Sequence, residues 1–121
     1  MAQQKLPPEV QQTIAQYQAI RDSYLKIDAE LRAIEAELAD INTILDTLST
    51  MSNDVEVYKM IGHVLIRKSK ENVVKELEER RELLNIKRDK YKRQLSILEK
   101  QLKDLESKLR EILSKYGISI G

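Results

Sequence analysis

The sequence predicts a mainly α-helical protein, a long antiparallel two-helix coiled-coil hairpin with one β-hairpin in its connector. Two long runs of apolar residues at heptad spacing flank a short stretch that is rich in β-branched residues. The 121 residues contain no Phe, Trp or Cys, while 41% are hydrophobic and 34% are charged. This composition is typical of long helices and poorly suited to a thick aromatic core, so we expect one domain built around a helical seam.

The first helix is predicted at about residues 8–50. From Val10 to Leu48, alternating steps of three and four residues reach an apolar residue or Tyr at eleven of twelve positions, with Thr13 as the exception. A stripe sustained over more than five heptads predicts a coiled-coil seam. Pro8 and the carboxylate after it suit a first helical turn, because proline loses no hydrogen bond there and the negative charge meets the positive end of the helix dipole.

The second helix is predicted at about residues 70–116. The same spacing runs from Val74 to Ile112 and is interrupted by Arg81 and Arg88. We expect these two arginines to lay their methylene groups along the seam and to send their charged heads to water. The serine before this helix is a candidate N-cap, and the Tyr-Gly pair near its end suits a helix stop.

One antiparallel register aligns the whole of the two stripes. The residue numbers of facing seam positions sum to 122, as for Leu38 with Leu84 and Leu45 with Leu77. Charge agrees with this pairing, because residues 1–60 hold five basic and ten acidic side chains and the rest of the chain holds sixteen basic and ten acidic. An acidic helix and a basic helix in one chain are expected to pair with each other.

The connector predicts a β-hairpin at about residues 55–67, with strands near 55–60 and 63–67 and a bend at Ile61-Gly62. An isolated two-stranded hairpin with apolar side chains on both faces is marginal in water and leaves its edges open. Because the chain offers no further strand pattern, the missing strands are expected to come from other subunits. The hairpin is therefore the predicted assembly element, through Val55, Val57, Tyr58, Met60, Ile61, Gly62, Val64, Leu65 and Ile66.

The connector and the arms beside it carry a family resemblance. The segment Val57-Tyr58-Lys59-Met60-Ile61-Gly62 is followed by Leu65, by Val73-Val74 and by the charged run that begins at Leu77. Midway between two heptad arms, this pattern resembles an archaeal prefoldin β-subunit over essentially the whole chain, so residues 1–121 are expected to form a single prefoldin-like domain. The β-type is implied because α-type subunits carry two hairpins in a longer connector.

The resemblance implies an ATP-independent molecular chaperone, a holdase. The hairpins of two α-type and four β-type subunits are expected to join in an intersubunit β-barrel from which the coiled coils project. The tips of the coiled coils are expected to capture unfolded or nascent proteins and to deliver them to a group II chaperonin. No cofactor is implied, and the three glycines of the chain are too sparse for a phosphate-binding loop.

The predicted client-binding tip is the end of the coiled coil where the two termini of the chain meet. Ile14 and Leu113 lie beside the strict seam and are expected to present apolar surface there. Two alternatives stay open: Val10 and Ile112 only finish the coiled-coil core, and the last residues form an unused tail. The full predicted set is Leu6, Val10, Ile14, Ile112, Leu113, Tyr116, Ile118 and Ile120.

Enzyme and metal-binding functions are not expected. With one histidine and no cysteine, the chain lacks a thiol nucleophile and the usual zinc ligand sets, and His63 is interpreted as a turn or strand residue. The basic cluster at residues 87–93 does not favour nucleic acid as a partner, because the net charge is only +1 and an acidic helix lies beside the cluster. It is interpreted instead as a contact for acidic stretches of a client or of the chaperonin.

The competing function is a structural or scaffolding coiled-coil oligomer without client binding. Heptad periodicity does not separate a scaffold from a chaperone, but a simple spacer needs no apolar strands in mid-chain. No stretch approaches the roughly 18–20 apolar residues that span a membrane, so no membrane partner is expected and the location is expected to be cytoplasmic.

Overall fold

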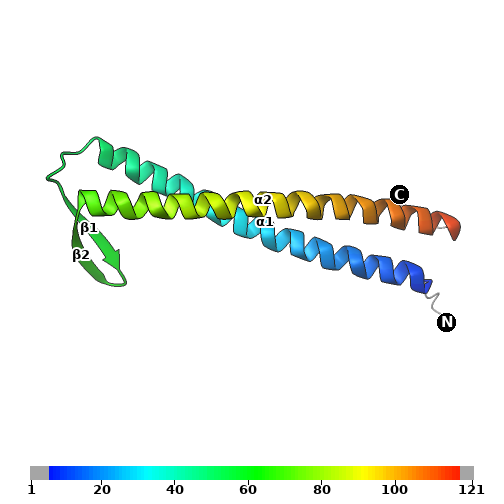
Figure 1. The fold of residues 1–121 in the computed structure, drawn as a ribbon. Helices are drawn as coiled ribbons and strands as arrows, with labels where there is room; N and C mark the ends of the chain where they lie inside the picture. Colours follow the sequence, from blue (N-terminus) through cyan, green and yellow to red (C-terminus); the bar gives the residue numbers. More distant parts are fainter. Residues whose placement is uncertain (1–5, 118–121) are drawn as a thin grey trace. The chain divides into compact units, whose positions relative to one another are not determined.

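The chain folds in the order helix, hairpin, helix (Figure 1). The computed structural model describes residues 6–117. Helix α1 spans Pro8–Ser49, strands β1 and β2 span Glu56–Ile61 and Val64–Ser69, and helix α2 spans Lys70–Lys115. Two long helices with one antiparallel β-hairpin between them confirm the fold class predicted from the sequence.

Both helices begin and end at residues whose chemistry explains the boundary. Pro8 takes the first helical position of α1, where its missing N–H leaves no hydrogen bond unmade. At the start of α2, the hydroxyl of Ser69 accepts a hydrogen bond of 3.2 Å from the backbone N–H of Asn72, which makes it the N-cap. Helix α2 ends at Lys115, and Gly117 follows with φ at +71°, a left-handed conformation that glycine adopts without strain.

The hairpin turns at Gly62 and His63, so the predicted bend at Ile61-Gly62 is wrong by one residue. Ile61 remains in β1 and pairs with Val64 across the turn. Gly62 has φ at +59° whereas His63 has no positive φ, which is the pattern of a type II′ turn with glycine at the first central position. Strand β2 also continues to Ser69, two residues beyond the predicted end at 67.

The chain divides into two compact units, and the central unit consists of residues 31–90. It contains the hairpin and a small core between the two helices. Leu38 of α1 and Leu84 of α2 share one buried cluster there, as the predicted register requires. The cluster also includes buried Ile41, and the half-buried residues that pack against it are Ile34, Leu45 and Leu77.

Two arginines occupy seam positions of the central unit. Arg81 donates a hydrogen bond of 3.2 Å from Nη1 to Oδ1 of Asn42, so the side-chain amide of an α1 residue binds the guanidinium group. The Nε of Arg88 is shielded from solvent and lies 3.5 Å from Oδ1 of Asp89. The expectation that both heads reach water is therefore only partly met, because polar side chains beside the seam contact each guanidinium.

The terminal unit consists of the remaining described residues of both helices and their flanks. Val10 and Ile112 pack with Leu113 in a buried cluster, which again satisfies the predicted register. Thr13, the exception in the first stripe, is only 2% exposed, and its hydroxyl donates a hydrogen bond of 2.9 Å to the carbonyl of Glu9. The polar atom in this core is thus satisfied within its own helix.

Candidate functional site

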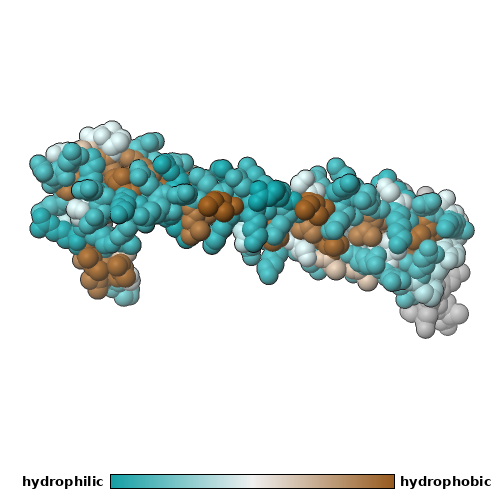
Figure 2. Space-filling view, viewed as in Figure 1, coloured by the Kyte–Doolittle hydropathy of each residue, from teal (hydrophilic) through white to brown (hydrophobic). Residues whose placement is uncertain are grey.

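Large apolar side chains stand exposed on the hairpin, and Figure 2 shows them as a hydrophobic patch over this element. Met60 and Leu65 face each other directly across the strands and are 70% and 60% exposed. An apolar patch of this kind on a single chain is typical of a protein interaction site. The exposed members of the predicted assembly set are Tyr58, Met60, Ile61, Val64, Leu65 and Ile66, beside the turn residue Gly62, whereas Val55 and Val57 are half-buried.

Both faces of the hairpin carry apolar residues. Neighbouring residues along a strand point to opposite faces, and directly paired residues share a face. Met60 and Leu65 therefore lie on one face, and Ile61 and Val64 lie on the other. The sheet formed by residues 6–117 has two strands, and a two-stranded sheet with apolar side chains on both faces is marginal by itself in water.

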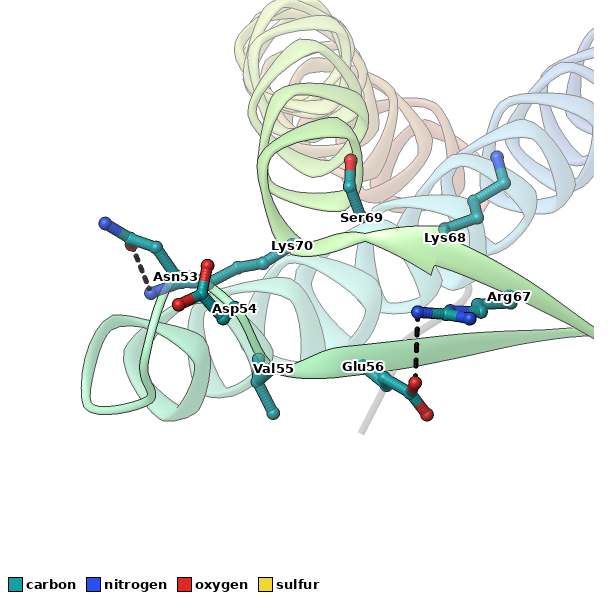
Figure 3. A pocket seen from close by; sticks show the side chains of 8 residues that line it. All are labelled: Asn53, Asp54, Val55, Glu56, Arg67, Lys68, Ser69 and Lys70. Atoms are coloured by element: carbon teal, nitrogen blue, oxygen red, sulfur yellow. Dashed lines mark hydrogen bonds and ion pairs between the residues drawn. The ribbon is translucent and has the colours of Figure 1, made fainter.

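The base of the hairpin, where the strands join the rest of the chain, is polar. Glu56 accepts a hydrogen bond of 2.9 Å from the hydroxyl of Tyr58, and its other carboxylate oxygen lies 3.0 Å from Nη2 of Arg67. Figure 3 shows Arg67 and Glu56 joined across the two strands. The hydrogen bond to the Glu56 carboxylate, together with its negative charge, raises the pKa of Tyr58. The hairpin is thus apolar toward its turn and polar toward its base.

Glu76 of α2 contacts both strands of the hairpin. Nζ of Lys68 in β2 lies 2.5 Å from Oε1 of Glu76, and Nζ of Lys59 in β1 lies 3.4 Å from Oε2. The hydrogen bond from Lys68 is the main cause that lowers the pKa of Glu76, and the positive charge of Lys59 adds to it. The sequence pattern did not single out Glu76. The available signal was that the two lysines share one face of the hairpin, where they favour an acidic partner.

Three of the predicted client-binding residues form the core of the terminal unit, and a fourth packs against it. Val10 and Ile112 are buried and finish the seam, which is the alternative that the sequence left open. Leu113 is only 7% exposed, so the expectation that it presents apolar surface is wrong. Ile14 packs against the same cluster and is half-buried. Residues beside the strict seam widen the apolar stripe of a helix, and here Leu113 joins the core while Ile14 packs at its margin.

Leu6 and Tyr116 are the exposed apolar members of the predicted tip, with exposed fractions of 42% and 50%. Gln11 donates a hydrogen bond of 2.7 Å from Nε2 to the carbonyl of Leu6, which fixes the path of the chain into α1. Both side chains are therefore exposed enough for a partner to contact them, and the backbone at Leu6 is held in place by this hydrogen bond. Ile118 and Ile120, the other predicted members, lie outside the described residues.

Residues 6–117 contain neither a candidate metal-binding cluster nor a candidate membrane-spanning helix. No group of three or more His, Asp or Glu side chains within this span could hold a metal ion. Neither α1 nor α2 has a segment long and apolar enough to cross a membrane. The basic side chains of the cluster at residues 87–93 are exposed apart from Arg88, which is half-buried.

Comparison with known proteins agrees with this architecture. The family model described as prefoldin subunit matches residues 11–116. A prefoldin subunit beta from Saccharolobus islandicus is 44% identical over 113 residues, which cover 93% of this chain and 90% of that protein, and the one from Sulfurisphaera tokodaii is 36% identical with the same coverage. The crystal structure of the prefoldin beta subunit from Thermococcus strain KS-1 aligns with a TM-score of 0.79 at 26% identity, over 92% of this chain and 97% of that one.

Proposed function

The chain belongs to the prefoldin family of chaperone subunits, and on that premise we propose that it acts as an ATP-independent holdase. It captures unfolded or nascent polypeptides in the cytoplasm at the end of its coiled coil and delivers them to a group II chaperonin. The observation that carries this proposal is the pair of exposed apolar side chains beside the closed core of the terminal unit, Leu6 and Tyr116. Weak apolar contacts suit unfolded chains of varied sequence, above all when several subunits present them together.

Assembly is the second part of the proposal. Prefoldin β-subunits form hetero-oligomeric complexes with other prefoldin subunits, and we assign this contact to the hairpin. Two α-type and four β-type subunits join their hairpins in an intersubunit β-barrel, which leaves no open strand edge. The exposure of Met60 and Leu65 on one face and of Ile61 and Val64 on the other supports this arrangement, because a barrel wall supplies neighbours for both strand edges and covers apolar side chains.

A scaffolding oligomer without client binding is the second candidate. Burial of Val10, Ile112 and Leu113 favours it, because a closed core leaves little apolar surface beside it. This function keeps the hairpin as the assembly element but assigns no role to Leu6 and Tyr116. The two candidates therefore differ in what the exposed side chains of the terminal unit do.

The deciding experiment follows the aggregation of a chemically denatured model protein diluted into buffer without ATP. The complex of this chain with its α-type subunit is compared with a complex in which residues 1–9 and 114–121 are deleted. Suppression by the full complex and its loss in the assembled truncation support the holdase. Absence of suppression by a properly assembled full complex favours the scaffold.

A matched pair of double variants sharpens the result. Leu6→Ser with Tyr116→Ser removes the exposed apolar groups beside the terminal core and should weaken suppression. Leu25→Ser with Ile97→Ser removes apolar groups that are 56% and 59% exposed along the helices of the same unit, and should leave suppression unchanged. Equal losses in both pairs would mean that capture depends on total apolar surface rather than on the ends. Delivery is then tested by transfer of a labelled client to an added group II chaperonin.

A further inference from the structure

Two seam positions of helix α2 in the central unit hold arginines. Arg81 and Arg88 are half-buried and lie in the sequence on either side of Leu84, which is 2% exposed. Their register positions face Ile41 and Ile34 of α1, which belong to the cluster around Leu84 or pack against it. A polar residue in such a seam lowers the stability of a coiled coil and determines its register and the number of helices that pair.

The contacts of Arg88 do not explain why a cation occupies its seam position. Its Nε is buried and has no hydrogen-bond partner within residues 6–117, and it lies 3.5 Å from Oδ1 of its own neighbour Asp89. An ion pair between adjacent residues of one helix forms without α1, so it does not favour the pairing of the two helices. A leucine at this position would bury apolar surface and leave no N–H unsatisfied, so Arg88 makes this helix pair less stable.

Helix α1 accommodates the cations around the first of these positions. Arg80, the residue before Arg81, donates two hydrogen bonds of 3.1 Å to the carboxylate of Glu37. Arg81 itself donates its hydrogen bond of 3.2 Å to the side chain of Asn42. Helix α1 thus presents an acid and an amide beside the seam where α2 presents two guanidinium groups, and α1 is a matching partner for α2.

A second copy of α2 running parallel would not match these cations. The other ten seam positions of α2 are apolar or Tyr, so the helix is otherwise well suited to pair with a copy of itself. In a parallel in-register pair each seam residue faces its own copy, and the residue before it lies beside the partner's seam. Arg81 would meet Arg81 and Arg80 of the other copy, and Arg88 would meet Arg88 and Lys87. Two layers of the seam would therefore hold only like charges, which repel each other.

We propose that Arg81 and Arg88 determine which helices pair, by keeping the α2 helices of neighbouring copies of this chain apart. This role rests on the proposed assembly and deepens it. In the proposed barrel the coiled coils project together, so the α2 helices of neighbouring copies begin at the same level and run in the same direction. Parallel in-register pairing is therefore the competing arrangement, and joining the copies raises their effective concentration for it.

The test replaces both arginines by leucine in the complex with the α-type subunit. Because the chain has no cysteine, Ser96→Cys at an exposed position of α2 carries one spin label per copy, attached before mixing with the unlabelled α-type subunit. Arg81→Leu with Arg88→Leu should produce dipolar broadening between labels of neighbouring copies that the parent lacks. The same pair should also raise the melting temperature, whereas arginines that only stabilise the helix pair would lower it on replacement. Far-UV circular dichroism checks the helical content of each chain.

Arg93→Leu with Lys100→Leu is the matched control. Both residues are exposed on α2 outside the seam and are seven positions apart, like the two arginines, so this pair removes the same charge and adds the same side chains. Equal broadening in the control, or an unchanged spectrum for the seam pair in an intact complex, would overturn the inference.

A failure of the proposed assembly is recognised separately, because the parent chain then forms no complex with the α-type subunit in light scattering. The pairing role is in that case tested on the full chain alone at high concentration. Arg81→Leu with Arg88→Leu should then increase self-association beyond that of the parent in sedimentation. Equal self-association of the two chains would overturn the role of the arginines.

Discussion

Nζ of Lys68 in β2 lies 2.5 Å from Oε1 of Glu76, and this contact ties the hairpin to helix α2. Lys59 of β1 approaches the other oxygen of the same carboxylate at 3.4 Å, so one residue of α2 restrains both strands. The three side chains are partly exposed, and salt bridges in such positions contribute little to global stability. Their effect is on orientation: they fix the face that the hairpin turns toward α2.

The titration of Glu76 should report this contact directly. The pKa of Glu76 is lowered, chiefly by the hydrogen bond from Lys68. The contact with Lys68 is therefore fully present above the ordinary glutamate pKa of about 4.3 and is lost as the pH falls through the lowered value. Lys68→Met should raise the pKa of Glu76 toward the ordinary value, as measured by carboxyl carbon NMR. If the titration midpoint of Glu76 is the same in Lys68→Met as in the parent, the contact between the two side chains does not form in solution.

Two adjacent leucines of α2 should differ sharply in their effect on stability. Leu84 is 2% exposed in the central core, whereas Leu83 is 45% exposed. Leu84→Ala should lower the free energy of unfolding by about 2–5 kcal/mol, because it leaves a cavity in addition to losing apolar burial. Leu83→Ala should lower it by less than about 1 kcal/mol. Urea unfolding followed by circular dichroism measures both, and equal losses would contradict the register.

The sequence predicted the long-range pairing well because a coiled coil repeats one local rule. Leu38 with Leu84 and Val10 with Ile112 were paired from heptad spacing alone, and both pairs share buried clusters. The short motif from Val57 to Gly62 predicted the prefoldin family, which the family model and the relatives confirm. Periodicity and one rare motif were therefore sufficient for the fold and the family.

Three details could not be predicted because they depend on contacts outside the repeat. Leu113 is buried because it packs beside Ile112 onto Val10, a contact that a strict two-position seam does not include. The turn is shifted because strand twist favours glycine at the first central position of a two-residue loop. Glu76 becomes a partner of both lysines only through the way the hairpin packs on α2.

The backbone of Gly62 should tolerate side chains according to their conformation rather than their size. An added Cβ meets no atom within 4 Å, but φ at +59° is unfavourable for alanine by about 1 kcal/mol or more. Gly62→Ala should therefore speed hydrogen exchange of the strand amides. Gly62→Asn should have a smaller effect, because asparagine visits the left-handed region more readily. A larger effect of Gly62→Asn than of Gly62→Ala would indicate that side-chain size, not backbone conformation, sets the cost.

Charges on the hairpin should abolish assembly while sparing the helices. Val64 and Ile66 are 59% and 40% exposed, so Val64→Asp and Ile66→Asp disturb no core of this chain. Both should leave helical content largely intact and prevent hetero-oligomer formation in light scattering, because a buried unpaired carboxylate is costly at an interface. Ile86→Asp is the control, since Ile86 is 60% exposed on α2 away from the hairpin. Assembly by both hairpin variants would exclude the barrel model.

The last prediction separates client capture from stability within the terminal unit. Tyr116 is 50% exposed, and its loss removes apolar surface but no core contact, so Tyr116→Ser should weaken suppression of aggregation without lowering the melting temperature. Leu113 is 7% exposed, and Leu113→Ala should lower the free energy of unfolding by about 2–5 kcal/mol. At a temperature where that variant stays folded, it should suppress aggregation like the parent. The opposite pattern, with capture lost in the Leu113 variant alone, would mean that the closed core must open to bind clients.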